Sequence, residues 1–418
     1  MKKCFLFIFL SYMLFAVLFG NQNKYPLDTA YHNEKEIAGQ IRTWQKNYPK
    51  LFSSQIIGYS NNEAKPIRSF KISKTPKAKD PNKAAILFVG QIHSEEPMGV
   101  EILISLADNI LRKYKNGDPE IKNLLNHFEL HFIPTINPEG FAVVNNGIYY
   151  NQRKNKTDTN NNGKFNPGYD GVDINRNFPI NWNNEEQFKP TDRYYAGKAP
   201  ASESETKAVM DFIKRENFYF AFNYHSSIMG EYNEKIYYPW YWKNGKSPHW
   251  YEMRNVAVIL AKNLKKDYLN DNYVIHEAYT SKVGFLRDWA YSEIGTFFYD
   301  IEVGGIYKNK SIVFPKNELL YSIIDKHLNA MFLTLSHIQN NTLKLILVNK
   351  QKQVLTNQPV SYYNLINKYV KPKKSNNKGI VYLFIPPDKD HFSIFVNKKK
   401  YKIKLTDMNR SEYILTID

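Results

Sequence analysis

A strand-like run that leads through a short polar loop into a helix constrains the fold of this chain most. The run AAILFVG covers Ala84 to Gly90, the loop QIHSEEP follows, and a helix is predicted from Pro97 to about Tyr114. The loop therefore lies just beyond the carboxyl end of a buried strand. Open α/β sheets bind their ligands at this edge.

Similar apolar runs recur along the chain and alternate with helical patterns. Strands are predicted for FELHFIP, FYFAFNYH and TFFYDIEV, and helices for residues 25–48, 253–269 and 317–337. Ser202 and Glu205 have the spacing of a capping box for one more helix. The alternation predicts an α/β fold, with a mixed, mostly parallel sheet covered by helices on both faces.

The two ends of the chain differ from this middle part. Residues 1–20 begin with two lysines and continue as an apolar run to Gly20, which is typical of a cleaved signal peptide. An uncleaved membrane anchor is the alternative, because Leu18 is not a small residue. The one cysteine, Cys4, lies in this leader, so the mature chain is expected to have no disulfide. From about residue 340, six short alternating strands predict a small C-terminal all-β sandwich.

The charge of the chain is strongly positive. The formal net charge is +17, and the segment from residue 340 holds fifteen Lys/Arg against five Asp/Glu. We expect a periplasmic or secreted monomer that can associate electrostatically with an anionic cell envelope. A solvated basic surface without a partner is the alternative. Nucleic acid is not an expected partner of an exported protein.

Three polar residues near predicted strand ends form a zinc-binding set. His93 and Glu96 lie three residues apart in the loop after the first strand, and His225 ends the strand FYFAFNYH. Two imidazoles and one carboxylate are typical ligands of catalytic zinc, which keeps its fourth position for water. Each residue alone is more often an ordinary loop or strand-end residue. Their combination predicts one Zn²⁺ per chain.

Further polar side chains suggest chemistry at the same edge. Glu302 and Asp300 share one face of the strand TFFYDIEV, so either carboxylate could be a general base beside the metal. The long Asn/Gly-rich segment 145–179 carries Arg153, a candidate for oxyanion stabilisation. It also carries Asn175 and Arg176, and a guanidinium can bind a carboxylate through two bonds.

These motifs resemble those of the zinc metallocarboxypeptidases of the carboxypeptidase A/B type, over about residues 25–337. The resemblance rests on GYSNNEAKPI, HSEE, NPEGF, QRKN, GVDINRNFP, ASESET, NYHSS and YDIEVGG, which occur in the family's order. It implies a catalytic domain over residues 21–339. Residues 340–418 resemble the transthyretin-like module of one family branch, mainly through NKGIVYLFIPP.

The resemblance also implies a role for each site residue. His93, Glu96 and His225 bind zinc, and Glu302 rather than Asp300 is the general base and acid. Arg153 polarises the scissile carbonyl, while Asn175 and Arg176 hold the terminal carboxylate of a peptide. Tyr279 is the nearest match to the family's mobile tyrosine, although it is one residue out of register. Arg287 occupies the place that shapes the pocket for the terminal side chain, where a cation would favour an acidic residue.

A second metal is a further candidate. Asp158, Asn160 and Asn162 form the opening D-x-N-x-N-G of a calcium loop, but position twelve is Tyr169 instead of glutamate. An Asn/Gly turn stabilised by bonds from side chains to the backbone is the alternative.

The sequence therefore predicts an exported zinc metallocarboxypeptidase that cleaves the C-terminal peptide bond of peptides. One alternative keeps the chemistry and changes the substrate to the stem peptides of murein. Another is a catalytically silent scaffold that binds through its C-terminal domain. The sequence leaves these alternatives open.

Overall fold

The computed structural model describes residues 31–182, 189–226, 234–242, 245–279, 284–304, 306–307, 310–311, 315, 317–362, 370–389, 391–404 and 412–417. The predicted leader lies outside these residues. None of the helices described combines the length and the apolar character needed to cross a bilayer.

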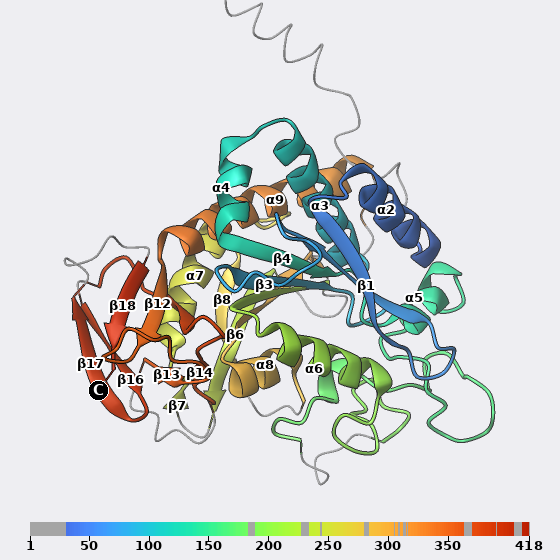
Figure 1. Ribbon diagram of the computed structural model, residues 1–418. Helices are drawn as coiled ribbons and strands as arrows, with labels where there is room; N and C mark the ends of the chain where they lie inside the picture. The colour runs from blue at the N-terminus through green and yellow to red at the C-terminus, as the bar shows by residue number, and fades with distance from the viewer. Residues whose placement is uncertain are drawn as a thin grey trace, which may run out of the picture.

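A nine-stranded mixed sheet forms the centre of the fold (Figure 1). Its strands follow the order β1-β2-β4-β3-β5-β9-β6-β7, and β8 pairs with β6. The central strands β4, β3, β5 and β9 are parallel, whereas β1, β2, β6 and β7 join antiparallel neighbours. The prediction of a mixed sheet is confirmed, but among the described strands of this sheet parallel pairing is found only between the central strands and between β6 and β8. The strand bounds are β1 Phe52–Tyr59, β2 Pro66–Ile72, β3 Ala84–Gly90, β4 Phe128–Ile133, β5 Phe220–Ser226, β6 Lys235–Trp242, β7 Gly245–Lys246, β8 Val274–Tyr279 and β9 Phe297–Val303.

Helices cover both faces of this sheet, as the alternating pattern predicts (Figure 1). One face packs against α2 (Glu34–Asn47), α3 (Met98–Lys115), α4 (Pro119–His127), α7 (Trp250–Lys262) and α9 (Asn317–Asn340). The other face packs against α6 (Ser204–Glu216) and α8 (Leu286–Ile294). The remaining short elements are α5 (Pro138–Asn145), the 3-10 turn Ile174–Arg176, β10 (Ile306–Tyr307) and β11 (Lys310–Ser311).

The β3–loop–α3 segment places the polar loop at the carboxyl edge of the sheet. Every residue of β3 is buried, as its apolar sequence dictates. Gly90 ends the strand where the chain passes close to β4: a Cβ there would lie 2.7 Å from the carbonyl oxygen of Pro134. Since β3, β5 and β9 are parallel, their carboxyl ends meet at one edge of the sheet.

The C-terminal part forms two sheets with the orders β15-β12-β18 and β14-β13-β16-β17. Apolar side chains from both sheets belong to one buried cluster, as in a sandwich. The likeness to a transthyretin-like module stays a prediction. The bounds are β12 Thr342–Val348, β13 Pro359–Ser361, β14 Lys373–Lys374, β15 Ile380–Phe384, β16 His391–Val396, β17 Lys399–Lys404 and β18 Glu412–Thr416.

This C-terminal part packs at the opposite end of the parallel strands from the polar loop (Figure 1). The ring of Phe384 in β15 lies 5.9 Å from that of Phe220, which is the first residue of β5. The ring of Tyr382 lies 6.2 Å from that of Tyr219. His225 lies near the other end of β5, away from these contacts.

Three buried glutamates surround the start of α6. Glu139 accepts bonds from Ser60 and from two backbone amides, whereas Glu203 accepts bonds from Asn155 and Thr157. Glu205 is fully buried, and the bonds that it accepts from Asn61, Asn155 and Ser204 are long, at 3.4 to 3.5 Å. Burial raises the pKa of Glu205 to about 8, and the carboxylates of Glu203 and Glu139 add to the rise.

We expect the Glu205→Gln substitution to flatten the pH dependence of stability. The folded-state pKa of Glu205 lies above its unfolded value. The stabilisation that protonated Glu205 gives the folded protein is therefore fully present below about pH 4.5 and is lost as pH rises to about 8. Stability falls by at most about 1.4 kcal/mol per pH unit across this window. Urea unfolding between pH 5 and pH 9 measures the slope, with the exposed Glu120→Gln as control. Parallel curves for the wild type and Glu205→Gln would contradict the assignment.

Candidate metal centre

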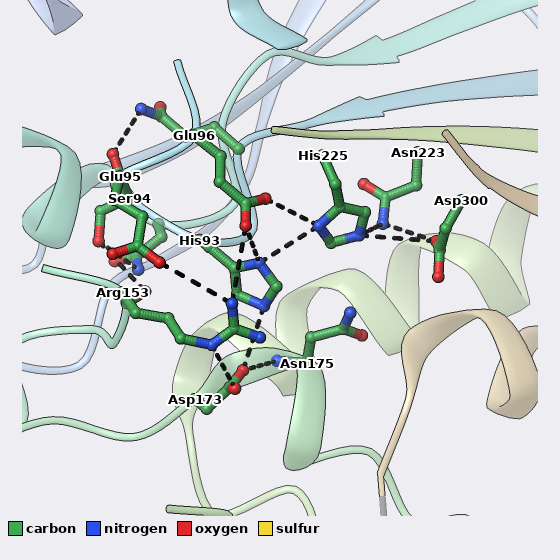
Figure 2. A network of polar contacts seen from close by, with 12 residues as sticks. His93, Ser94, Glu95, Glu96, Arg153, Asp173, Asn175, Asn223, His225 and Asp300 are labelled. Carbon is green, nitrogen blue, oxygen red and sulfur yellow. Dashed lines mark hydrogen bonds and ion pairs between the residues drawn. The ribbon is translucent and has the colours of Figure 1, made fainter. Parts of the chain in front are cut away.

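The residues of the predicted zinc set meet at the carboxyl edge of the sheet (Figure 2). Nδ1 of His93 lies 2.9 Å from one oxygen of Glu96, and Nδ1 of His225 lies 2.8 Å from the other. The two Nδ1 atoms are 3.2 Å apart. All three side chains are buried, and their ligand atoms lie within 4.8 Å of one another. The long separation of these residues in sequence is closed by the parallel pairing of β3 with β5.

The donor atoms of this group fit a divalent metal. Two imidazole nitrogens lie 3.2 Å apart and both face one carboxylate. If both nitrogens carry a proton, two N–H donors face each other, and if one does not, its lone pair faces the carboxylate. A cation accepts a lone pair from each of the three side chains at once. Two nitrogens and one oxygen are a donor set that suits Zn²⁺. Within the described part of the chain, this is the one cluster of three such side chains.

Burial and neighbouring charges shift the pKa values of both histidines in the group. Burial alone would lower the pKa of His225, yet the carboxylates of Glu96 and Asp300 raise it well above its usual value. Burial lowers the pKa of His93, and the nearby Arg153 guanidinium lowers it further. His93 is therefore neutral near pH 7, which is the form in which an imidazole binds a metal.

Arg153 and Asp173 lie against the other side of this group (Figure 2). Nε2 of His93 is 3.3 Å from Oδ1 of Asp173, and Nε of Arg153 donates to Oδ2 of Asp173 at 2.8 Å. The Nη1 atom of Arg153 lies 3.6 Å from Glu96. Asp173 was not predicted as a site residue, although it lies within the motif GVDINRNFP. It lies behind His93, which is the place from which a carboxylate can orient an imidazole for metal binding.

Glu302 lies beside His225 at the end of β9. The parallel register pairs Glu302 with His225 and Asp300 with Asn223, so both acids face the helix α8 side of the sheet. Glu302 is the one residue of β9 that is partly exposed. Burial raises its pKa to about 7; His225 opposes this rise, whereas Glu96 and Asp300 add to it. A carboxylate with this pKa is suited to accept and return protons near neutral pH.

Asn175 and Arg176 lie in a short 3-10 turn that Asp173 caps. Oδ1 of Asn175 accepts a bond of 3.0 Å from the backbone amide of Leu286, which leaves its amide nitrogen for another partner. The Arg176 guanidinium stacks over Phe285 at 4.4 Å and lies 3.9 Å from Asp173. Burial lowers its pKa to about 10, so it stays charged at neutral pH.

The two remaining residues predicted to bind substrate, Tyr279 and Arg287, have different outcomes. Tyr279 ends β8, but its side chain lies outside the described part, and its role stays a prediction. Arg287 is buried and bonds to both Asp288 and Asp300. Its charge is thus balanced by carboxylates, and a preference for an acidic terminal residue stays a prediction with a weaker electrostatic basis.

The predicted calcium residues form a turn in the structure. Asp158 accepts a bond from the amide of Gly163 at 2.8 Å, and Asn160 accepts one from Asn162 at 3.0 Å. Asn162 in turn accepts a bond from the amide of Lys164 at 2.8 Å. These are the bonds of the Asn/Gly turn that the sequence left open as the alternative. Calcium binding stays a prediction.

Sequence reasoning missed several polar residues around the site. Glu95 is fully buried between Arg153 and Arg193, and Asn223 lies between His225 and Asp300. Each of the two is close in sequence to a residue that was predicted. Glu95 precedes Glu96, and Asn223 is two residues before His225 on the same strand face. A second acid in HSEE and strand alternation were the available signals.

Known proteins resemble this chain over most of the α/β part. Mouse carboxypeptidase M is 28% identical over 204 residues, which are 49% of this chain and 40% of that protein. Mouse carboxypeptidase A2 is 28% identical over 302 residues, which are 70% of this chain and 66% of that protein. The matched segments are less than two thirds of the length of these relatives.

Solved structures share the fold. The crystal structure of thrombin-activatable fibrinolysis inhibitor has a TM-score of 0.62 at 24% identity and covers 73% of this chain and 74% of its own. That of carboxypeptidase A from Helicoverpa armigera also has a TM-score of 0.62, at 19% identity, and covers 79% of each chain.

The family match covers the part of the chain that holds the metal centre. Residues 37–328 match the Peptidase_M14 family, described as zinc carboxypeptidase. This range includes His93, Glu96, His225 and Glu302. On this match, over more than half of its length, the chain belongs to the zinc carboxypeptidase family.

Proposed function

We propose that this protein is an exported zinc carboxypeptidase that hydrolyses the last peptide bond of peptides ending in a free carboxylate. The observation that carries the proposal is the shared role of Asp173. This carboxylate lies 3.3 Å from His93 and 3.9 Å from Arg176, so it links the metal-binding group to a buried cation beside it. A terminal carboxylate on Arg176 and Asn175 would place the adjoining peptide bond near the metal-binding group.

Each step of the reaction has a candidate residue. Zinc bound by His93, Glu96 and His225 would supply Lewis-acid activation of a water molecule. Glu302 takes the proton of the attacking water and passes it to the leaving amine. Arg153 stabilises the negative charge that develops on the carbonyl oxygen. The requirement for a free carboxylate makes the enzyme an exopeptidase.

A residue-release assay tests this proposal. Purified protein is incubated with zinc and a mixed library of peptides and muropeptides, and the released amino acids are identified by mass spectrometry. We expect release of single C-terminal residues, none from peptides with an amidated C-terminus, and no release by Glu302→Gln. Equal cleavage of free and amidated peptides would contradict the role of Arg176.

The same assay decides between the alternatives. Release from muropeptides alone would identify murein stem peptides as the substrate, to which a basic C-terminal domain is suited by charge. Stoichiometric zinc without release from any substrate would favour a binding scaffold. The presence of Glu302 and Arg153 beside the metal-binding group supports an enzyme over a scaffold.

Gly284 provides a sharper test of the carboxylate site. Its φ is +67°, and a Cβ there would lie 1.8 Å from the backbone oxygen of Arg176. We expect Gly284→Ala to displace Arg176 and to lower kcat/KM by about 100-fold, mainly through KM. Gly295→Ala is the control, because Gly295 also has a positive φ (+75°) beside α8 but lies against Lys373. Equal losses in both variants would indicate general strain instead of a displaced Arg176.

A further inference from the structure

The second histidine of the metal-binding group has its own set of buried polar partners, on the side away from Glu96 (Figure 2). Oδ1 of Asp300 lies 3.7 Å from Nε2 of His225. The amide nitrogen of Asn223 lies 2.7 Å from the same Nε2 and donates to Asp300 at 2.9 Å. The strand register explains the arrangement, because β5 and β9 pair Asn223 with Asp300 on one face of the sheet.

Asp300 is itself held by a buried arginine. Arg287 bonds to Asp300 through Nη1 and to Asp288 through Nε, the latter at 3.1 Å. Arg287 and Asp300 are each 3% exposed, so this ion pair is shielded from water. Arg287 lies in the first turn of α8, which packs on the same face of the sheet.

The partners of His225 repeat those of His93 on the other side of the metal-binding group. His93 is backed by Asp173, and Arg153 bonds to Asp173; His225 faces Asp300, and Arg287 bonds to Asp300. We propose that Asp300, fixed by Arg287, is a positioning residue that orients His225 for metal binding, in addition to the role of Asp173 behind His93. This inference rests on the proposed zinc function and assigns Arg287 to Asp300 instead of to substrate.

The tautomer of His225 gives the physical reason. The nitrogen that faces Glu96 and His93 is Nδ1, so a metal at that position requires the proton of the neutral ring to be on Nε2. That Nε2–H then needs an acceptor in a buried site. The carboxylate of Asp300 is the charged acceptor that faces it, at 3.7 Å, and Asp300 also holds the side chain of Asn223, which lies 2.7 Å from the same Nε2. An acceptor of this kind fixes the ring and strengthens it as a ligand.

Zinc affinity tests the role of Asp300, and the chain offers a matched control. Asp288 and Asp300 are both buried and both bond to Arg287, but only Asp300 faces His225. Zinc dissociation constants of the full chain are measured by competition with a chromogenic chelator. We expect Asp300→Asn to weaken zinc binding by about 10- to 100-fold and Asp288→Asn to leave it unchanged. Thermal melting of the metal-free proteins shows whether the variants fold.

The outcomes separate this inference from the proposed function. Equal zinc affinity of Asp300→Asn and the wild type, or equal loss in both variants, would overturn the positioning role while leaving the carboxypeptidase intact. A wild-type protein that binds no zinc would instead overturn the proposed function. If Asp300→Asn does not fold, nitrogen-15 NMR of the zinc-loaded wild type decides. Two downfield Nε2–H signals from the ligand histidines support the proposal, and one contradicts it.

Discussion

Replacing Glu302 by glutamine is expected to lower kcat/KM by about 10²- to 10⁴-fold without loss of bound zinc. The carboxylate lies beside His225 at the carboxyl end of β9 and is the partly exposed residue of that strand. Its pKa of about 7 suits a group that takes a proton from water and returns it to the leaving amine. Glutamine has nearly the same shape and cannot accept that proton. Steady-state kinetics on a C-terminal peptide substrate, together with zinc analysis, measures both expectations.

Asp300 is the comparison that the strand itself provides for Glu302. Both acids share one face of β9, but Asp300 is bonded to Arg287 and Asn223 and is not available to a water molecule. At saturating zinc, we therefore expect Asp300→Asn to retain far more activity than Glu302→Gln. Equal losses would mean that the two acids act together, and loss of zinc from Glu302→Gln would make Glu302 a ligand.

The meeting of His93, Glu96 and His225 at one place could be predicted because each follows a pattern with its own physical meaning. His93 and Glu96 come after a fully apolar run, and His225 ends another, so parallel pairing brings them to one edge. The helix predicted from Pro97 to about Tyr114 is α3, Met98–Lys115. Segments with such strong periodicity can be predicted without knowing which elements pack against them.

Segments whose bonds depend on distant partners were predicted less well. No helix was predicted at the motif NPEGF, but Asn137 caps the amide of Gly140 and begins α5. The prediction that Ser202 and Glu205 form a capping box is wrong. The helix α6 starts after Glu203 without a side-chain cap, because Ser202 bonds to Glu203 and Asn177 while Glu205 is buried.

The buried ion pairs were beyond the reach of the sequence for the same reason. Alternation placed Asp300 on the correct face of its strand, but only the packing of α8 brings Arg287 to it. From sequence, Arg287 was a free cation in a pocket. In the fold it is a buried group between two carboxylates, which changes its expected role.

Arg153 combines burial with fixed geometry, which oxyanion stabilisation requires. Its guanidinium bonds to Asp173, lies 3.6 Å from Glu96 and stacks over Tyr194 at 5.1 Å. Burial would disfavour its charge, but Asp173 and Glu96 raise its pKa, so it stays cationic at every working pH. A cation held in this way does not have to reorganise when negative charge develops beside it.

Replacing Arg153 by glutamine is therefore expected to lower kcat by about 10²- to 10³-fold, with a smaller change in KM. Arg193 is the matched control: it also contacts Glu95, but no bond joins it to Asp173 or Glu96 among the residues described. We expect Arg193→Gln to lose much less activity. Kinetics with zinc-saturated variants of equal melting temperature measures the difference. An increase in KM with kcat unchanged would place Arg153 in substrate binding, and equal losses in both variants would contradict a specific oxyanion role.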